Sequence, residues 1–314
     1  MAKWTKKRKW LTFTLSALGV MFIGIAIYAY SIYSSVEKTL NVIHEPIERV
    51  VSEKRIEEVK FEEQDPISVL ILGVDERAND RGRSDTIIVM TINPTTKSMR
   101  MVSIPRDTRT EIIGRGFNDK INHAYAFGGV EMAMNTVENF LDIPIDYFVK
   151  VNMEGFQDIV DAVGGVTVNS TFAFDYEGYS FGEGELTMDG KMALAYSRMR
   201  YDDPRGDFGR QDRQKQIIQG VIDKGATISS ITKIDDILGV IGSNVKTNLT
   251  LTEMVDIQKN YKDARHSLEK LTLTGSGTKI NGIYYLQVSE EDRSALSLQL
   301  KEHLNMNEST VSTN

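Results

Sequence analysis

The chain has no cysteine among its 314 residues. This absence excludes disulfide bonds, thiolate metal sites and cysteine nucleophiles. Histidine is also scarce, and the spacing typical of zinc ligands is not found among the four that are present: His44, His123, His266 and His303. A zinc site is therefore not expected.

Positive charge is in short supply outside the first ten residues. The chain has 37 basic and 44 acidic residues, and residues 1–10 hold five of the basic ones and no acidic one. The remainder therefore carries a net charge of about −12. Because nonspecific nucleic-acid binding depends on neutralising phosphates, we expect no nucleic-acid partner, and a transcriptional regulator is disfavoured.

Charged residues are absent from residues 11–33, which are rich in Leu, Ile, Val, Phe and Ala. A helix of this length spans a bilayer core, and the basic run before it predicts a cytoplasmic N-terminus. Aromatic residues lie at both edges, as in an interfacial belt: Trp4, Trp10, Tyr28, Tyr30 and Tyr33. The alternative is a signal peptide cleaved near residues 29–31, but the apolar run is long for one. We expect an uncleaved, single-pass membrane anchor with the rest of the chain outside the cell.

Five segments follow from this composition. They are a cytoplasmic basic segment at 1–10, the anchor at 11–33, a charged stalk at 34–66, one folded domain at 67–305 and a disordered polar tail at 306–314. Within the domain, apolar and β-branched runs predict strands at 67–74, 86–92, 98–104, 147–151, 166–170, 269–274 and 283–288. Helical patterns occur at 129–141, 153–163, 210–225, 229–241, 251–262 and 289–304. The expected fold class is α/β, with a central mixed β-sheet flanked by helices.

Residues 197–214 contain five arginines and no lysine. The planar fork of arginine meets carboxylate or phosphate oxygens two at a time, which an ammonium group cannot do. Four aspartates share the stretch, so an internally paired surface is the alternative. A helix that starts with Asp207 as its N-cap would place Arg210, Gln214, Ile218 and Ile222 on one i, i+4 ridge. The positive end of that helix would carry the two polar members, so an anion site is favoured.

Two carboxylates flank the loop between the first two predicted strands. Asp75 ends one strand and Asp85 begins the next, so both come to the same end of the sheet if the strands are neighbours. Such a pair, without His or Cys nearby, suits Mg²⁺, which takes oxygen ligands and keeps waters for a phosphate to replace. An ordinary Asp-rich turn is the alternative. Arginines share the same loop: Arg77, Arg81 and Arg83.

The third predicted strand ends at Pro105, and Arg106, Asp107 and Arg109 follow it. Ligands of open α/β sheets commonly bind at strand ends. Three separate segments thus place Arg and Asp at such positions. Together they indicate a pyrophosphate held by arginines with Mg²⁺ on the same oxygens, as in phosphoryl transfer.

Five ordered motifs also resemble a known family. They are LILGVDER, GRSDTIIVMTINP, SIPRDT, KINHAYAFGG and SRMRYDDPRGDFGRQDRQ, and they span about residues 67–225. In order and spacing they are similar to the LytR-CpsA-Psr family of Gram-positive bacteria.

The resemblance implies a metal-dependent transferase that acts outside the membrane. Such enzymes move an anionic glycopolymer, for example wall teichoic acid, from a polyprenyl-pyrophosphate carrier to a sugar hydroxyl of peptidoglycan. It implies catalytic roles for Asp75, Asp85 and Arg106, with both aspartates on Mg²⁺ and one of them helping to deprotonate the hydroxyl. It implies substrate binding by Arg83, Arg198, Arg200, Arg210, Arg213 and Gln214.

The polyprenyl tail would need an apolar pocket. Ile217, Ile218 and Val221 are candidates to line it, with ordinary helix core as the alternative. Two other functions use the same residues. One is hydrolysis of the carrier pyrophosphate, and the other is a non-catalytic polyprenyl-phosphate binder that regulates wall assembly.

Overall fold

The computed structural model describes residues 42–49, 51–55, 57–76, 82–225 and 244–306. The predicted anchor at 11–33, the helix at 229–241 and all of the predicted tail except residue 306 lie outside these ranges. Among the helices within them, none is both long and apolar enough to cross a membrane.

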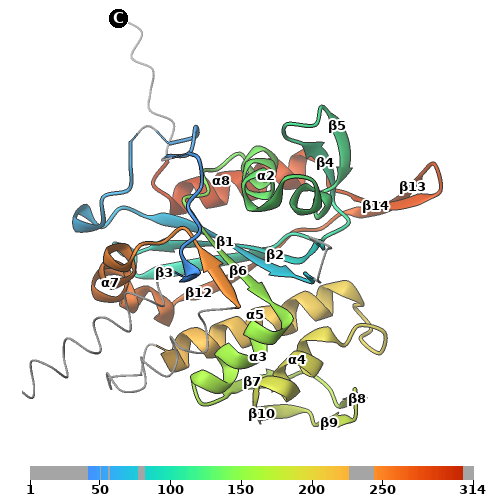
Figure 1. Ribbon diagram of the computed structural model, residues 1–314. Coiled ribbons are helices and arrows are strands. Elements are labelled where there is room, and N and C mark those ends of the chain that lie inside the picture. Colours follow the sequence, from blue (N-terminus) through green and yellow to red (C-terminus); the bar gives the residue numbers. More distant parts are fainter. Residues whose placement is uncertain (1–41, 50, 56, 77–81, 226–243, 307–314) are drawn as a thin grey trace, which may run out of the picture.

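A six-stranded mixed sheet forms the centre of the domain (Figure 1). Its order is β11 (Val245–Thr247), β6 (Tyr147–Asn152), β1 (Ile67–Val74), β2 (Ser84–Asn93), β3 (Ser98–Ser103) and β12 (Leu268–Thr272). β1 is antiparallel to β2 and parallel to β6. β2 and β3 are antiparallel, and β12 lies parallel to β3. The expected α/β class with a central mixed sheet is confirmed.

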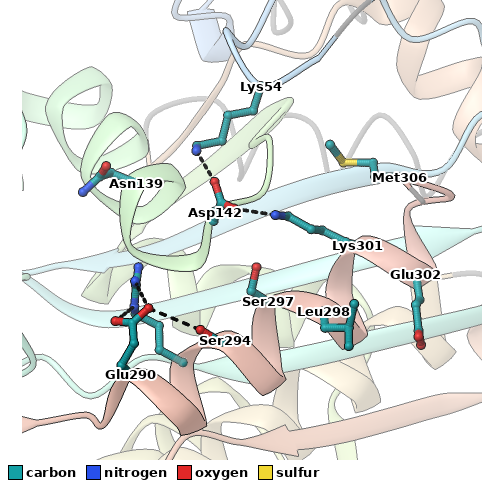
Figure 2. Close-up of a pocket in the computed structure, with 11 residues that line it drawn as sticks. Lys54, Asn139, Asp142, Glu290, Ser294, Ser297, Leu298, Lys301, Glu302 and Met306 are labelled. Carbon is teal, nitrogen blue, oxygen red and sulfur yellow. Dashed lines mark hydrogen bonds and ion pairs between the residues drawn. The ribbon is translucent and has the colours of Figure 1, made fainter. Parts of the chain in front are cut away.

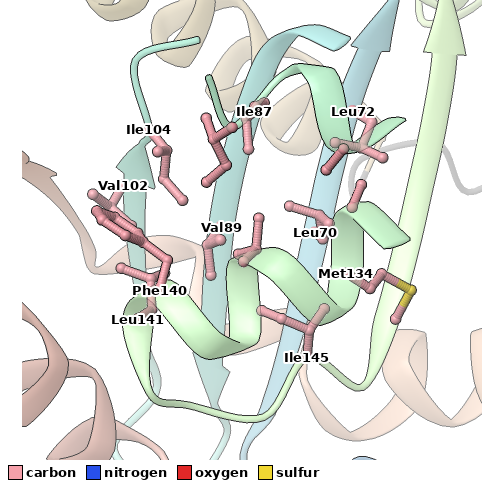
Figure 3. Close-up of a cluster of buried hydrophobic side chains, with 14 of the residues drawn as sticks. Leu70, Leu72, Ile87, Val89, Val102, Ile104, Met134, Phe140, Leu141 and Ile145 are labelled. Atoms are coloured by element: carbon pink, nitrogen blue, oxygen red, sulfur yellow. The ribbon is translucent and has the colours of Figure 1, made fainter. Parts of the chain in front are cut away.

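The first strand is almost entirely apolar because both of its faces are covered, and the hydroxyl of its one polar residue, Ser68, is buried and donates to Pro144 O and Asp146 Oδ2. Leu70 and Leu72 pack with α2 (His123–Leu141) and α8 (Glu290–His303) in one core (Figure 3). Ile67 and Val69 belong to a second core on the other face. Successive side chains of a strand point to opposite faces, so a doubly covered strand shows a continuous hydrophobic run.

Helices form the two outer layers. α2 and α8 lie over one face of the sheet in Figure 1, and α5 (Asp207–Gly225) and α7 (Leu251–Asn260) lie on the other side. The short helices η1 (Phe61–Glu63) and η2 (Lys262–His266) contribute to the core on the α7 side.

A third core lies below the sheet in the same view. It joins α3 (Met153–Ala162), α4 (Gly190–Arg198) and α5 to two small antiparallel pairs. These pairs are β7 (Val166–Ser170) with β10 (Gly184–Met188), and β8 (Phe174–Tyr176) with β9 (Tyr179–Phe181). Two further hairpins, β4 (Arg109–Ile112) with β5 (Phe117–Lys120) and β13 (Ser276–Ile280) with β14 (Ile283–Gln287), meet at the bridge between Thr108 and Leu286.

The elements differ from the sequence-based expectations in three ways. α2 begins at His123 rather than at 129, with a break at Gly128 and Gly129, where Gly129 has a φ of 70°. α4 and seven short strands, β4, β5, β8, β9, β10, β11 and β13, were not predicted, because short elements depend on the neighbours they pack against. α5 begins at Asp207 itself, which therefore lies in the first turn instead of preceding it.

Candidate active site

Three strand ends meet at one edge of the sheet, namely the edge formed by the C-terminal ends of β1 and β3 and the N-terminal end of β2. Since β1 and β2 are antiparallel neighbours, Asp75 after β1 and Asp85 near the start of β2 come together there. Both line a cavity of about 560 Å³, together with Arg83. β3 is antiparallel to β2, so Arg106 follows at the same edge, where its Nη1 donates to Asp85 Oδ1 at 3.0 Å.

The N-terminal end of α5 brings more guanidinium groups to this edge. Arg210 Nη2 lies 2.5 Å from Asp207 Oδ1, and Arg200 Nε lies 3.8 Å from the same oxygen. Arg210 Nε is buried and has no hydrogen-bond partner within the described parts of the chain. Such a donor is available to an oxygen of a bound anion.

The pKa shifts show that these charges act on one another. Burial lowers the pKa of Arg210, and Arg106 and Arg200 lower it further, against the opposing effect of Asp207. Burial also lowers the pKa of Arg106, but Asp85, Asp107 and Asp207 outweigh it, so this pKa is raised. Arg210 thus lies where positive charge is concentrated, and an anion would relieve that repulsion.

An apolar pocket of about 230 Å³ opens beside this cluster on the α5 side of the sheet. Ile217, Ile218 and Val221 line it, together with residues of β1, β6, α3 and α4. Arg198 and Gln214 also belong to its lining. The pocket thus combines an apolar interior with two polar side chains that were expected to bind a phosphate group.

Arg198 forms an ion pair within the protein. Its Nη1 lies 3.1 Å from Glu177 Oε1, and its side chain is 47% exposed. Surface pairs of this kind are weak, so the guanidinium remains available to a stronger anionic ligand.

Arg213 is separated from the other predicted binding residues. It is 3% exposed, and its guanidinium donates to Asp203 Oδ2, to Tyr196 O at 3.0 Å and to Met199 O. Gly209 permits this arrangement, since a Cβ there would lie 1.8 Å from Asp203 Oδ2. Arg213 therefore holds the turn after α4 in place and does not face a ligand.

The carboxylates Asp75 and Asp85 form a donor set that fits Mg²⁺. No group of three or more His, Asp or Glu side chains suited to a metal ion occurs in the described ranges. Mg²⁺ needs fewer protein ligands, because it keeps several waters and commonly binds through one or two carboxylates and substrate phosphates.

Two pairs in this region were not predicted as site residues. Lys120 Nζ lies 2.6 Å from Asp107 Oδ1, and His123 Nδ1 lies 2.7 Å from Asp119 Oδ2. Three of the four come from β5 and the start of α2, within or beside the KINHAYAFGG motif. The sequence signal that could have revealed the hairpin that positions them is Gly-Arg-Gly at 114–116. Both glycines have positive φ in the turn.

A larger hollow of about 630 Å³ lies far from this edge, between the C-terminal end of α2 and α8 (Figure 2). Its charged side chains pair with one another: Lys54 and Lys301 both contact Asp142, and Arg293 contacts Glu290. These are solvent-exposed pairs on a polar surface, and they converge on no catalytic group.

Comparison with known proteins agrees with this geometry. The model of the LytR_cpsA_psr family matches residues 30–302. A curated relative is the polyisoprenyl-teichoic acid–peptidoglycan teichoic acid transferase TagU of Bacillus subtilis, which is 59% identical over 300 residues, covering 95% of this chain and 97% of the relative.

Solved structures show the same fold. The crystal structure of B. subtilis TagU has a TM-score of 0.64 and 60% identity, and the match covers 76% of this chain and 97% of that one. A structure described as TagT bound to LIIa-WTA has a TM-score of 0.72 and 33% identity, covering 83% of this chain and all of that one. With its motifs in order, its strand ends carrying the paired Asp and Arg residues, and relatives matched over nearly their full length, the chain belongs to the LytR-CpsA-Psr family.

Proposed function

We propose that this chain is a transferase that moves an anionic glycopolymer, such as wall teichoic acid, from a polyprenyl-pyrophosphate carrier to a sugar hydroxyl of peptidoglycan. The names of the curated relatives support this reaction. The observation that carries the proposal is the apolar pocket whose lining includes Arg198 and Gln214 and which lies beside Arg106 and Arg210. One site can thus hold an isoprenoid tail and a diphosphate.

The bonds that change in this reaction define the task of each side chain. The acceptor oxygen forms a bond to the polymer-side phosphorus, and the bond from that phosphorus to the bridging oxygen breaks. Polyprenyl monophosphate leaves, and the hydroxyl proton passes to a carboxylate, for which Asp75 and Asp85 are the candidates. Arg106, Arg200 and Arg210 offset the charge that develops on the leaving phosphate.

We also propose that Mg²⁺ is the cofactor and that Asp75 and Asp85 hold it. When bound, it would neutralise charge on the phosphate oxygens. The ion pair between Arg106 and Asp85 holds that carboxylate in position before any ligand arrives.

A membrane anchor at residues 11–33 is part of the same proposal, with the catalytic domain outside the cell. An anchored enzyme and a lipid-linked donor share one surface, so their effective concentration rises.

The test uses the purified chain with a radiolabelled polymer on a polyprenyl-pyrophosphate carrier and a soluble peptidoglycan oligomer. Transfer predicts label joined to the oligomer, with one polyprenyl monophosphate released for each polymer moved. Label recovered only as free polymer would instead indicate a hydrolase.

Substitution of the two carboxylates distinguishes a transferase from a non-catalytic binder. Asp75→Ala and Asp85→Ala should abolish transfer while polyprenyl phosphate still binds in the apolar pocket. If both variants support wall assembly in cells as well as the wild type does, the chain acts by binding alone.

A further inference from the structure

The cavity at the ends of β1 and β2 has a second wall to which the reaction described so far assigns no role. Asp75, Arg83 and Asp85 form one side. The second wall comes from β5 and the first turns of α2, and its described members are Asp119, His123, Ala126 and Phe127.

The polar part of this second wall is held in a fixed arrangement. Asp119 Oδ2 lies 2.7 Å from His123 Nδ1, and Asp119 Oδ1 accepts from the Tyr285 hydroxyl at 3.2 Å and from the backbone N–H of Lys120 at 2.8 Å. A carboxylate bound to one ring nitrogen sets the imidazole tautomer and leaves the other nitrogen for a ligand. The pair can therefore exchange hydrogen bonds with a hydroxyl or an amide.

The apolar part of the wall is aromatic. The Phe127 ring lies 5.9 Å from the rings of His123 and Phe117, and the Arg115 guanidinium lies 5.1 Å from the Phe127 centroid. Phe117 is 47% exposed, so the aromatic surface extends beyond the cavity. The break at Gly128 and Gly129 separates this short helical segment from the rest of α2 and sets its direction independently.

Among the described residues, charge at the cavity favours a neutral ligand over a second anion. This part of the lining carries three carboxylates, Asp75, Asp85 and Asp119, and the guanidinium of Arg83. Aromatic rings beside groups that donate and accept hydrogen bonds suit a sugar ring, which has an apolar C–H face and a rim of hydroxyls.

The position of the cavity relative to the apolar pocket gives the ligand its role. The apolar pocket is lined by α5 and α3 on one face of the sheet, whereas the aromatic wall comes from α2 on the other. Asp85 lies at the edge between them. In phosphoryl transfer the attacking and leaving oxygens are roughly in line with the phosphorus. If the lipid phosphate leaves on the α5 side, the attacking hydroxyl arrives from the α2 side.

We propose that this cavity is the subsite for the acceptor sugar of peptidoglycan, with His123 and Phe127 as its recognition residues and Asp119 as a positioning residue. The subsite rests on the proposed transfer reaction, since only an acceptor needs a place opposite the leaving group.

The experiment compares His123→Gln and Phe127→Leu with the wild-type chain. His266→Gln is the matched control, because His266 is exposed on η2, away from the cavity. The KM for a peptidoglycan oligosaccharide is measured at saturating donor. Dissociation constants are measured for two donors, a bare polyprenyl pyrophosphate and one that carries the first sugar of the polymer. Thermal unfolding checks that each variant is folded.

We expect both variants to raise the acceptor KM about tenfold or more, with both donor dissociation constants and the unfolding temperature unchanged. An unchanged KM would overturn the subsite. Weaker binding of the sugar-bearing donor alone would overturn it as well, because the cavity would then hold the donor's sugar.

Failure of the proposed function can be distinguished from failure of the subsite. A wild-type chain that transfers nothing contradicts the proposed function, and calorimetry with the oligosaccharide alone then decides the subsite. Binding to the wild type that His123→Gln weakens supports the subsite, and equal or absent binding in both proteins overturns it.

Discussion

Two arginines less than one turn apart on α5 have opposite roles. Arg213 is surrounded by protein acceptors and lies over the Phe174 ring at 5.5 Å, so its charge is fully compensated inside the domain. Arg210 is half-buried, retains a buried Nε without a partner in the described structure, and lies near the like charges of Arg106 and Arg200. The first arginine stabilises the fold, whereas the second is placed where positive charge costs stability and favours a ligand.

This difference predicts that Arg210→Ala removes activity without unfolding the protein. Loss of one preorganised charge at a developing anion typically lowers the rate about 10²- to 10³-fold. We expect that loss in the transfer assay and a free energy of unfolding within about 1 kcal/mol of the wild type, because repulsion with Arg106 and Arg200 is relieved. Arg205→Ala is the control, since Arg205 lies in the same segment with its side chain 51% exposed and pairs with Asp212 at 2.6 Å. Equal losses in both variants would contradict this assignment.

Asp203→Ala should have the reverse effect. Asp203 is 5% exposed and carries the counter-charge of Arg213. Removing one partner of a buried pair leaves an uncompensated charge, which costs about 3–5 kcal/mol. Denaturant unfolding measures this loss, and Asp202→Ala, at the exposed neighbour, is the control. A cost below about 1 kcal/mol for Asp203→Ala would show that the pair is not structural.

At the scale of elements, hydrogen bonds from the side chain of His303 connect the end of α8 to the sheet. Its Nδ1 lies 2.7 Å from Thr91 Oγ1 of β2, and its Nε2 lies 2.9 Å from Ser98 Oγ of β3. Burial, and secondarily Arg100, lower the pKa of His303 to about 4, while Glu269 opposes the shift. The imidazole is therefore neutral in the folded protein near pH 6, where the unfolded chain begins to bind a proton.

This shift predicts a pH-dependent attachment of α8. Between pH 6.5 and 4 the unfolded state binds more protons at this position, so the free energy of unfolding falls as the pH is lowered, by up to about 3 kcal/mol. Unfolding curves for the wild type and His303→Gln across this range isolate the contribution from that of the carboxylates. The variant should lose less stability on acidification, and parallel pH profiles would contradict the account.

How well each element could be predicted depends on what determines it. The bounds of β1 were predicted to the residue, since a strand covered on both faces shows a nearly continuous apolar run. The meeting of Asp75, Asp85 and Arg106 followed from their positions at strand ends. The roles of Arg210 and Arg213 were not separable, because α4 and the turn after it determine which guanidinium is buried. Likewise, Ile217 could be placed on a helix, but a pocket beside it depends on how α3, α4 and α5 pack.

At the scale of the whole molecule, the apolar pocket, the arginine cluster of Arg106, Arg200 and Arg210, and the carboxylates Asp75 and Asp85 lie next to one another and form one continuous binding site. The carboxylates predict that a chelator stops transfer, and that added Mg²⁺ restores it. The described lining of the apolar pocket includes no Asp or Glu, so binding of a polyprenyl monophosphate should weaken much less than transfer does. Full transfer in the presence of excess chelator would contradict the metal assignment.

The central claim is that one lipid places its tail in the apolar pocket and its diphosphate on the arginine cluster. A crystal structure of the chain with a polyprenyl pyrophosphate bound tests it most directly. We predict the tail between α5 and the sheet, against Ile217 and Ile218, and the diphosphate oxygens in contact with Arg106, Arg198 and Arg210. A diphosphate bound elsewhere, or a tail outside the pocket with these arginines unchanged, would contradict the account.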